Sequence, residues 1–319
     1  MQLLLFIGGI ALFLFAMQLL EHSVRSLATA RLKSTLLQFT RTPLLSVCTG
    51  IVATAVLQSS SLLGLILLAL LAVKAIPLKN AIGVILGANL GTTITGWFIV
   101  IFGFKLGWEY LIILLLLLLF IILVFSKNLT EVRSRAKAFF AFFLLLVALW
   151  SMKTGIEFVY QYLDIKTFNQ SPIWLFFIIG ALLTSVTQSS SATMAIALSA
   201  VNADIIELPN AVALIIGADL GTTSTVILGA VRGAKIKRQL AFVHLSFNTI
   251  VDLLALLALP TLLFVSTDLL EITDSLIILV SIHTFFNLIG LLIFMPFLSQ
   301  LESLTVKLFT KKSETNPPF

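Results

Sequence analysis

Charged side chains are scarce in this chain: Asp, Glu, Lys and Arg together make up 11% of its 319 residues. Hydrophobic residues make up 59%, and the mean hydropathy is +1.13. A soluble domain of this length needs far more polar surface, so that class is excluded. The apolar runs match the roughly 20 residues with which a helix crosses a bilayer core. We therefore predict an all-α polytopic membrane protein whose partner is the lipid bilayer.

Cysteine and histidine are also rare, with one cysteine and three histidines. The single Cys48 excludes an intrachain disulfide. Cys48 is alone in its segment and His22 lies at the end of another, which argues against a zinc site. The net charge of +6 would suit a nucleic acid, but the basic residues lie mostly in short loops between apolar segments. We therefore expect no nucleic-acid partner.

Seven apolar segments have the length of a full crossing, and the first lacks the basic start and cleavage site of a signal peptide. They are 2–20, 80–104, 108–126, 137–160, 209–231, 239–263 and 273–297. Two further stretches, 44–73 and 172–202, carry the tetrapeptide QSSS at their midpoints. Split there, each half is about 13–15 residues, on the order of 20 Å of helix. We predict that these two stretches form re-entrant hairpins with tips near the bilayer middle.

The basic residues test this topology. With two re-entrant hairpins, all but Lys105, Lys153 and Lys166 of the 20 basic residues lie on one side, a division of 17 against 3. If each hairpin were one crossing, the division would be 14 against 6. The positive-inside rule favours the hairpins, in a plasma (inner) membrane, with the N-terminus outside and the C-terminus in the cytoplasm.

The chain repeats itself at a constant offset of 130 residues: LKNAIGVILGANLGTTIT (78–95) aligns with LPNAVALIIGADLGTTST (208–225). Three crossings separate the hairpins, which predicts inverted repeats of the kind that many secondary transporters share. We divide the chain into 1–130, the first repeat with a broken helix at 80–104; 131–263, the second with a broken helix at 209–231; 264–298, an extra C-terminal crossing; and 299–319, a short cytoplasmic tail.

The QSSS tips are predicted to bind an anion. A hairpin tip leaves the first N–H groups of its second helix without intrahelical acceptors, serine hydroxyls add donors, and the helix dipole favours negative charge. The alternative is that small residues merely let helices pack closely. The candidate substrate-binding residues are Gln58, Ser59, Ser60, Ser61, Gln188, Ser189, Ser190 and Ser191.

The segments GANLGTT (87–93) and GADLGTT (217–223) are predicted to bind a cation. Two glycines permit unwinding, and the freed carbonyls with nearby side-chain oxygens would suit sodium. The alternative is a simple glycine-hinged kink. A carboxylate within a span is costly and usually functional, which draws attention to Asp219. The candidate cation-binding residues are Asn89, Thr92, Thr93, Asp219, Thr222 and Thr223.

A His-x-x-Phe-Asn pattern occurs in each of the last two spans. In HLSFNTIVD (244–252) the polar residues recur every four positions and so share one helical face; HTFFN (283–287) repeats the pattern. Such residues are often hydrogen-bonded packing groups rather than ligands. The secondary candidates are His244, Asn248, Asp252, His283 and Asn287.

Paired QSSS motifs, each followed by a Gly-Ala-Asn/Asp-Leu-Gly-Thr-Thr segment, resemble the type II sodium–phosphate cotransporters and their bacterial relatives. The resemblance covers most of residues 1–300 and implies phosphate and sodium sites at the QSSS residues and the adjoining segments. Asp219 departs from the usual asparagine. About 20 residues follow the last span, so we expect a short form without the cytoplasmic PhoU-like domain of many bacterial members.

The expected function is therefore sodium-coupled symport of inorganic phosphate by alternating access, with sodium as coupling ion and no further cofactor. One alternative is a cation-coupled transporter of another oxyanion or carboxylate, such as sulfate or a dicarboxylate, because serine hydroxyls suit all of these. A passive channel is a second alternative. An enzyme is not expected, because the sequence offers no nucleophile–base pair and no metal-ligand set.

Overall fold

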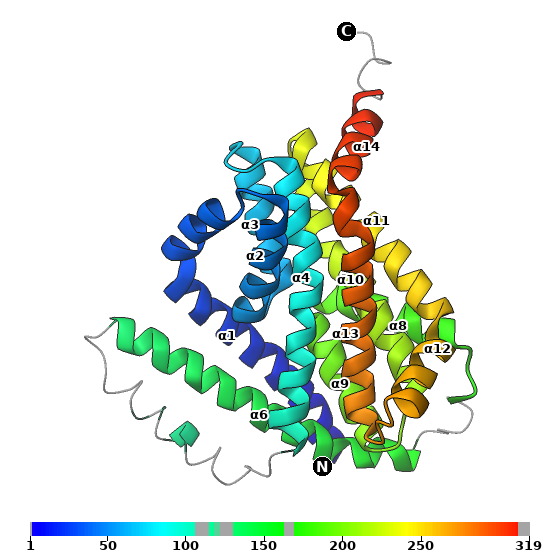
Figure 1. Ribbon diagram of the computed structural model, residues 1–319. Helices are drawn as coiled ribbons and strands as arrows, with labels where there is room; N and C mark the ends of the chain where they lie inside the picture. The colour runs from blue at the N-terminus through cyan, green and yellow to red at the C-terminus, as the bar shows by residue number, and fades with distance from the viewer. Residues whose placement is uncertain are drawn as a thin grey trace.

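The structure is a computed structural model and describes residues 2–105, 115–117, 119, 121, 130–162 and 169–311 (Figure 1). No strand occurs among these residues, which agrees with the predicted all-α membrane class. The helices in chain order are α1 (Gln2–Phe39), α2 (Pro43–Leu57), α3 (Ser60–Ala72), α4 (Leu78–Phe98), the π-helix η1 (Ile99–Lys105), α6 (Thr130–Tyr162), α8 (Ile173–Thr187), α9 (Ser190–Asn202), α10 (Leu208–Val231), α11 (Lys235–Leu257), α12 (Leu259–Phe264), the π-helix η2 (Val265–Leu269), α13 (Ser275–Phe294), the 3-10 helix η3 (Met295–Phe297) and α14 (Leu298–Lys311).

Both QSSS segments form two-residue breaks between helices. The glutamines end α2 and α8 in the left-handed conformation, with φ of 54° at Gln58 and 55° at Gln188. The next residues, Ser59 and Ser189, are extended, and their hydroxyls cap the helices that follow. The breaks therefore fall at the predicted positions. How deep they lie in the bilayer, and whether the two halves are inverted, stay predictions.

The two predicted broken helices are continuous, which corrects the sequence interpretation. α4 runs unbroken from Leu78 to Phe98 through GANLGTT, and α10 runs unbroken from Leu208 to Val231 through GADLGTT. Their backbone carbonyls are therefore held in helical hydrogen bonds instead of being freed for a cation.

The glycines of these segments serve close packing instead. A Cβ added to Gly87 would overlap the carbonyl oxygen of Val47 on α2, and one added to Gly217 would overlap that of Phe177 on α8. Gly87 and Gly217 each begin a Gly-x-x-x-Gly pattern, which is typical of membrane helices that approach backbone to backbone. α2 thus packs tightly on α4, and α8 on α10.

Among the described residues, four helical segments are long and apolar enough to cross a membrane: Leu78–Lys105, Leu208–Val231, Lys235–Leu257 and Ser275–Thr310. They correspond to predicted crossings at 80–104, 209–231, 239–263 and 273–297. The first predicted crossing, 2–20, is part of a longer helix, because α1 continues past Glu21 to Phe39. Likewise 137–160 lies inside α6. The predicted crossing 108–126 falls almost entirely outside the described residues.

The helices divide into a pair and a larger group. α1 and α6 pack against each other, while α13 packs against both α4 and α10 near the centre of the molecule (Figure 1). The α2–α3 and α8–α9 segments pack on the central helices. Many large apolar side chains are exposed on the outside, among them Val186 and Leu257. Exposed apolar helices of this length are typical of a multi-pass membrane protein.

Candidate functional site

The two QSSS segments, far apart in the sequence, line one cavity of about 360 Å³. We call it the tip cavity. All eight predicted substrate-binding residues contribute to its wall. The other polar residues of the wall are Gln18, His22, Thr92, Thr187 and Thr225.

Each tip glutamine is tied to the long helix of its own half. Thr95 Oγ1 donates to Gln58 Oε1 at 2.9 Å, and Thr225 Oγ1 donates to Gln188 Oε1. Each amide nitrogen also donates to a backbone carbonyl three residues earlier. The left-handed conformation is uncommon for residues other than glycine. These bonds hold both glutamines in it, and so fix the shape of the tips.

The second tip makes additional contacts. Gln188 Nε2 donates to Ser224 Oγ at 3.1 Å. Ser61 Oγ, from the first tip, donates to Thr225 Oγ1 at 3.2 Å. Thr225 therefore contacts both tips and joins the two halves through polar side chains at the cavity.

The tip cavity presents neutral donors to whatever occupies it. The helices α3 and α9 both begin there, and the N–H groups of their first turns lack intrahelical acceptors. The hydroxyls of Ser60, Ser61, Ser190 and Ser191 lie beside them. Among the described residues, the wall contains no Lys, Arg, Asp or Glu. Two positive helix ends and several hydroxyls in one cavity are suited to a small anion.

The predicted cation-binding residues do not form the expected nest of freed carbonyls. The hydroxyls of the four threonines donate back to carbonyls of their own continuous helices at 2.7–3.1 Å; they are Thr92, Thr93, Thr222 and Thr223. The other two residues, Asn89 and Asp219, are buried and face neighbouring helices instead.

The two His-x-x-Phe-Asn patterns supply the partners of Asn89 and Asp219. Asn89 Nδ2 donates to Asn248 Oδ1 on α11, and Asn248 Nδ2 donates to the backbone oxygen of Asp219 at 2.9 Å. Asn287 Nδ2, on α13, donates to Asp219 Oδ2 at 3.0 Å. The pattern thus places one asparagine against the equivalent position of each half.

The remaining secondary candidates are buried, and several of their polar atoms have no hydrogen-bond partner within the described part of the chain. Among the described residues, both ring nitrogens of His244, both carboxyl oxygens of Asp252 and Nδ1 of His283 lack hydrogen bonds. The tip cavity includes none of the three. The described residues also contain no group of three His, Cys, Asp or Glu side chains that could hold a metal ion.

A second, much smaller cavity adjoins the tip cavity. Its volume is about 10 Å³, near the lower limit for one water-sized particle. We call it the narrow cavity. Asp219 and His283 are among its lining residues, and Thr92, Ser190 and Ser191 line both it and the tip cavity. Asp219 is the one acidic residue among the described residues of its wall.

Sequence reasoning missed two residues that shape the site, Thr95 and Thr225. They are the last aligned threonines of the repeated segments 78–95 and 208–225, so their recurrence was a signal. A helical threonine commonly bonds to its own helix, and its bond to a glutamine elsewhere is a tertiary contact that spacing alone does not reveal.

Apolar helices with two polar breaks that meet in one cavity are the construction of a membrane transporter. The Na+/Pi-cotransporter family matches residues 12–154 and 165–289, and the chain belongs to that family. Family membership agrees with a transporter rather than an enzyme.

Individual relatives are more distant. A Bacillus subtilis protein named "Uncharacterized protein YqeW" is 30% identical over 258 residues, which cover 78% of this chain and 80% of that protein. The Escherichia coli K12 "Putative inorganic phosphate export protein YjbB" is 25% identical over 300 residues, or 93% of this chain. The Salmonella typhimurium protein of the same name matches equally well. The chain spans 54% of the length of these YjbB proteins. No solved structure matches the chain.

Proposed function

We propose that the chain is a sodium-coupled symporter of inorganic phosphate that works by alternating access and binds phosphate in the tip cavity. The observation that carries the proposal is the meeting of both QSSS tips in one cavity of about 360 Å³. Family membership supports phosphate as the substrate, and so does the printed name of the YjbB relatives.

The tip cavity suits a doubly charged oxyanion although the described residues of its wall include no lysine or arginine. Hydroxyls and first-turn N–H groups from two helices can surround it and donate to its oxygens. Hydrogen phosphate also carries a proton that needs an acceptor, which Gln58 Oε1 or Gln188 Oε1 can supply. Sulfate has no such proton, so these acceptors favour phosphate over it.

Sodium is proposed to bind in the narrow cavity beside Asp219. An anion in the tip cavity would be repelled by this carboxylate, because the two cavities share wall residues. A cation between them converts the repulsion into attraction. Phosphate therefore binds well only after the cation, which couples the two fluxes. Asn89, at the equivalent position, is uncharged, so no cation is needed there to offset repulsion of the anion.

The decisive experiment is uptake of radiolabelled phosphate by proteoliposomes, with and without an inward sodium gradient. Concentrative uptake that requires the gradient is expected, and unlabelled phosphate should compete far better than sulfate or succinate. Uptake that only equilibrates would indicate a channel. Equal competition by sulfate or succinate would contradict phosphate selectivity. Loaded vesicles with an outward sodium gradient test efflux, the direction named for YjbB.

The proposed orientation, with the C-terminus in the cytoplasm of a plasma (inner) membrane, has its own test. In a variant that lacks Cys48, a cysteine at Lys237 should react with an impermeant thiol reagent only from the cytoplasmic side. A cysteine at Thr273 should react from outside. Labelling of both from one face would contradict the topology.

A further inference from the structure

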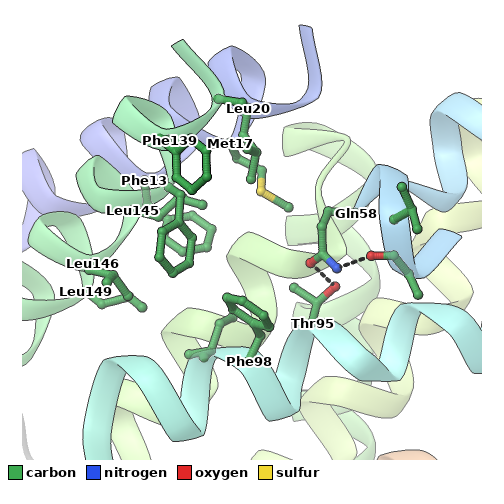
Figure 2. Close-up of a pocket in the computed structure, with 15 residues that line it drawn as sticks. Phe13, Met17, Leu20, Gln58, Thr95, Phe98, Phe139, Leu145, Leu146 and Leu149 are labelled. Atoms are coloured by element: carbon green, nitrogen blue, oxygen red, sulfur yellow. Dashed lines mark hydrogen bonds between the residues drawn. The ribbon is translucent and has the colours of Figure 1, made fainter. Parts of the chain in front are cut away.

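A third cavity, of about 420 Å³, lies between the α1–α6 pair and the α2–α4 pair. We call it the apolar cavity. Figure 2 shows Phe13 and Met17 of α1 and several residues of α6 on one wall, and Gln58, Thr95 and Phe98 on the facing wall. Its volume lies within the range of about 300–1,000 Å³ that is typical of small-molecule pockets.

The lining of this cavity is suited to an apolar occupant. Gln58 and Thr95 are its only polar residues among the described part of the chain. Their side chains already bond to each other at 2.9 Å, and Gln58 Nε2 donates to a backbone carbonyl (Figure 2). Water would gain few hydrogen bonds there, and cavities of this kind stay dry or take up apolar molecules.

The rim of the cavity identifies the source of that occupant. Three of its lining residues are large, apolar and exposed: Val56 by 61%, Phe98 by 39% and Phe139 by 59%. They lie on apolar helices that form the outer surface of a membrane protein, so the opening is continuous with the surface that faces hydrocarbon. The molecules that meet this rim are lipid acyl chains.

We propose that the apolar cavity binds one acyl chain of a membrane lipid. The site adjoins the tip cavity, because Met17 and Gln58 line both. An acyl chain packed on Gln58 reinforces its bond to Thr95 and holds the first tip. Acyl-chain occupancy therefore slows phosphate transport, a consequence that rests on the proposed function.

The site is tested by titrating the purified protein, in detergent, with the fluorescent fatty acid cis-parinaric acid. We expect saturable binding of about one probe per chain. Leu146→Trp fills the cavity and should weaken binding at least about tenfold, because the indole displaces two or more methylene groups. Leu144→Trp, on the same helix but outside the lining, is the matched control and should bind normally.

Two additional measurements separate binding from misfolding and from transport. Leu146→Trp should keep the unfolding temperature of the wild type; if it does not, Ala138→Phe, which fills the same cavity, replaces it. In proteoliposomes, added fatty acid should slow phosphate uptake by wild type and Leu144→Trp but not by the filled variant.

The outcomes are distinguishable. Non-saturable binding, or equal binding by the filled and control variants, overturns the acyl-chain site. Normal binding with uptake that ignores fatty acid overturns the effect on transport. Normal binding by a protein that moves no phosphate overturns the proposed function and leaves the acyl-chain site standing.

Discussion

Asn89 and Asp219 occupy equivalent positions in the two halves of the chain, in long helices that cross their neighbours in the same way. Both are buried, and both face an asparagine of a His-x-x-Phe-Asn pattern. The Asn89 amide donates a hydrogen bond to the Asn248 amide, so this contact joins two neutral groups. Asp219 brings a carboxylate and is contacted by two asparagines. The two halves thus share a frame, by which we mean the close helix crossings and the facing asparagines. They differ in one buried acidic side chain.

The tips differ less than the helices behind them. Both glutamines are left-handed, both are held by a threonine, and both are followed by a capping serine. Under the proposed function, we expect anion binding to use both halves alike and cation binding to depend on the second half. Matched substitutions in the two halves test this expected difference.

The largest effect is expected where the halves are most alike. Gly87→Ala and Gly217→Ala each force a methyl group into a facing backbone carbonyl, which neither helix can avoid by a rotamer change. We expect each to destabilise the protein by about 3 kcal/mol. Thermal unfolding in detergent measures this. Gly8→Ala, where the added atom meets nothing within 4 Å, is the control. Tolerance in one half alone would show that the crossings are not equivalent.

Loss of a tip hydroxyl should weaken phosphate binding in either half. Ser60→Ala and Ser190→Ala each remove one donor to a charged ligand, worth about 1.5–3 kcal/mol or roughly 10- to 150-fold in affinity. Equilibrium binding of labelled phosphate measures it. Ser199→Ala, which removes a buried hydroxyl of α9 without a partner among the described residues, should change nothing. Unchanged phosphate affinity in both variants would contradict phosphate binding by the two tips.

Asp219→Asn makes the second half resemble the first. Phosphate transport should survive, because Asn89 is an amide at the equivalent position, but the sodium concentration for half-maximal uptake should rise at least about tenfold. The charge moved per phosphate should also change, at roughly 2.3 kcal/mol per elementary charge per 100 mV. Uptake at different membrane potentials measures both. Asp268→Asn, an exposed acid of η2, is the control.

If Asp219 carries a proton instead, wild-type uptake will depend on pH and the Asp219→Asn variant will lose that dependence. If sodium, voltage and pH dependence are all unaltered, Asp219 merely supports the helix network and leaves the cation site.

Removal of the threonines that hold the tip glutamines should have a smaller and unequal effect. Thr95→Val removes the bond to Gln58, whereas Thr225→Val removes the bond to Gln188 and also the contact with Ser61. One hydrogen bond is worth about 0.5–1.5 kcal/mol. Phosphate affinity should therefore fall a few-fold in the first variant and further in the second. The reverse order would contradict the role of Thr225 between the tips.

The smallest effect concerns the end of η1, where Lys105 Nζ pairs with Asp274. Partial burial works to raise the pKa of Asp274, but the hydrogen bond from Lys105 and the backbone N–H groups at the start of α13 outweigh it, so the pKa is lowered. The stabilisation is therefore present above the ordinary pKa of aspartate and lost as the pH falls through the lowered value.

Because both side chains are partly exposed, the pair is worth at most about 1 kcal/mol. Lys105→Met should flatten the acidic limb of a plot of unfolding temperature against pH. Lys235, at the same offset of 130, donates to the neutral Thr310 hydroxyl, so Lys235→Met should leave that limb unchanged.

The hairpin breaks were predictable because a glutamine followed by a capping serine interrupts an apolar run twice, at matching positions. The state of the long helices was not. Glycines at 87 and 91 permit either unwinding or close approach, and the choice depends on α2, whose carbonyls happen to face them. The hydrogen-bond partners of Asn248 and Asn287 could not be predicted either. Helical spacing places each asparagine on a face of its helix but does not say which helix that face contacts.

The close helix crossings at glycine also affect which residues can differ between the two repeats of the sequence. Six positions without side chains, Gly50, Gly87 and Gly91 with Gly180, Gly217 and Gly221, let backbone touch backbone in both halves. A gene that duplicates such a unit obtains two copies of the frame at once. Because close backbone contacts at these glycines set the frame, residues behind it can differ between the halves. One frame therefore carries a neutral residue at position 89 and an acidic residue at position 219.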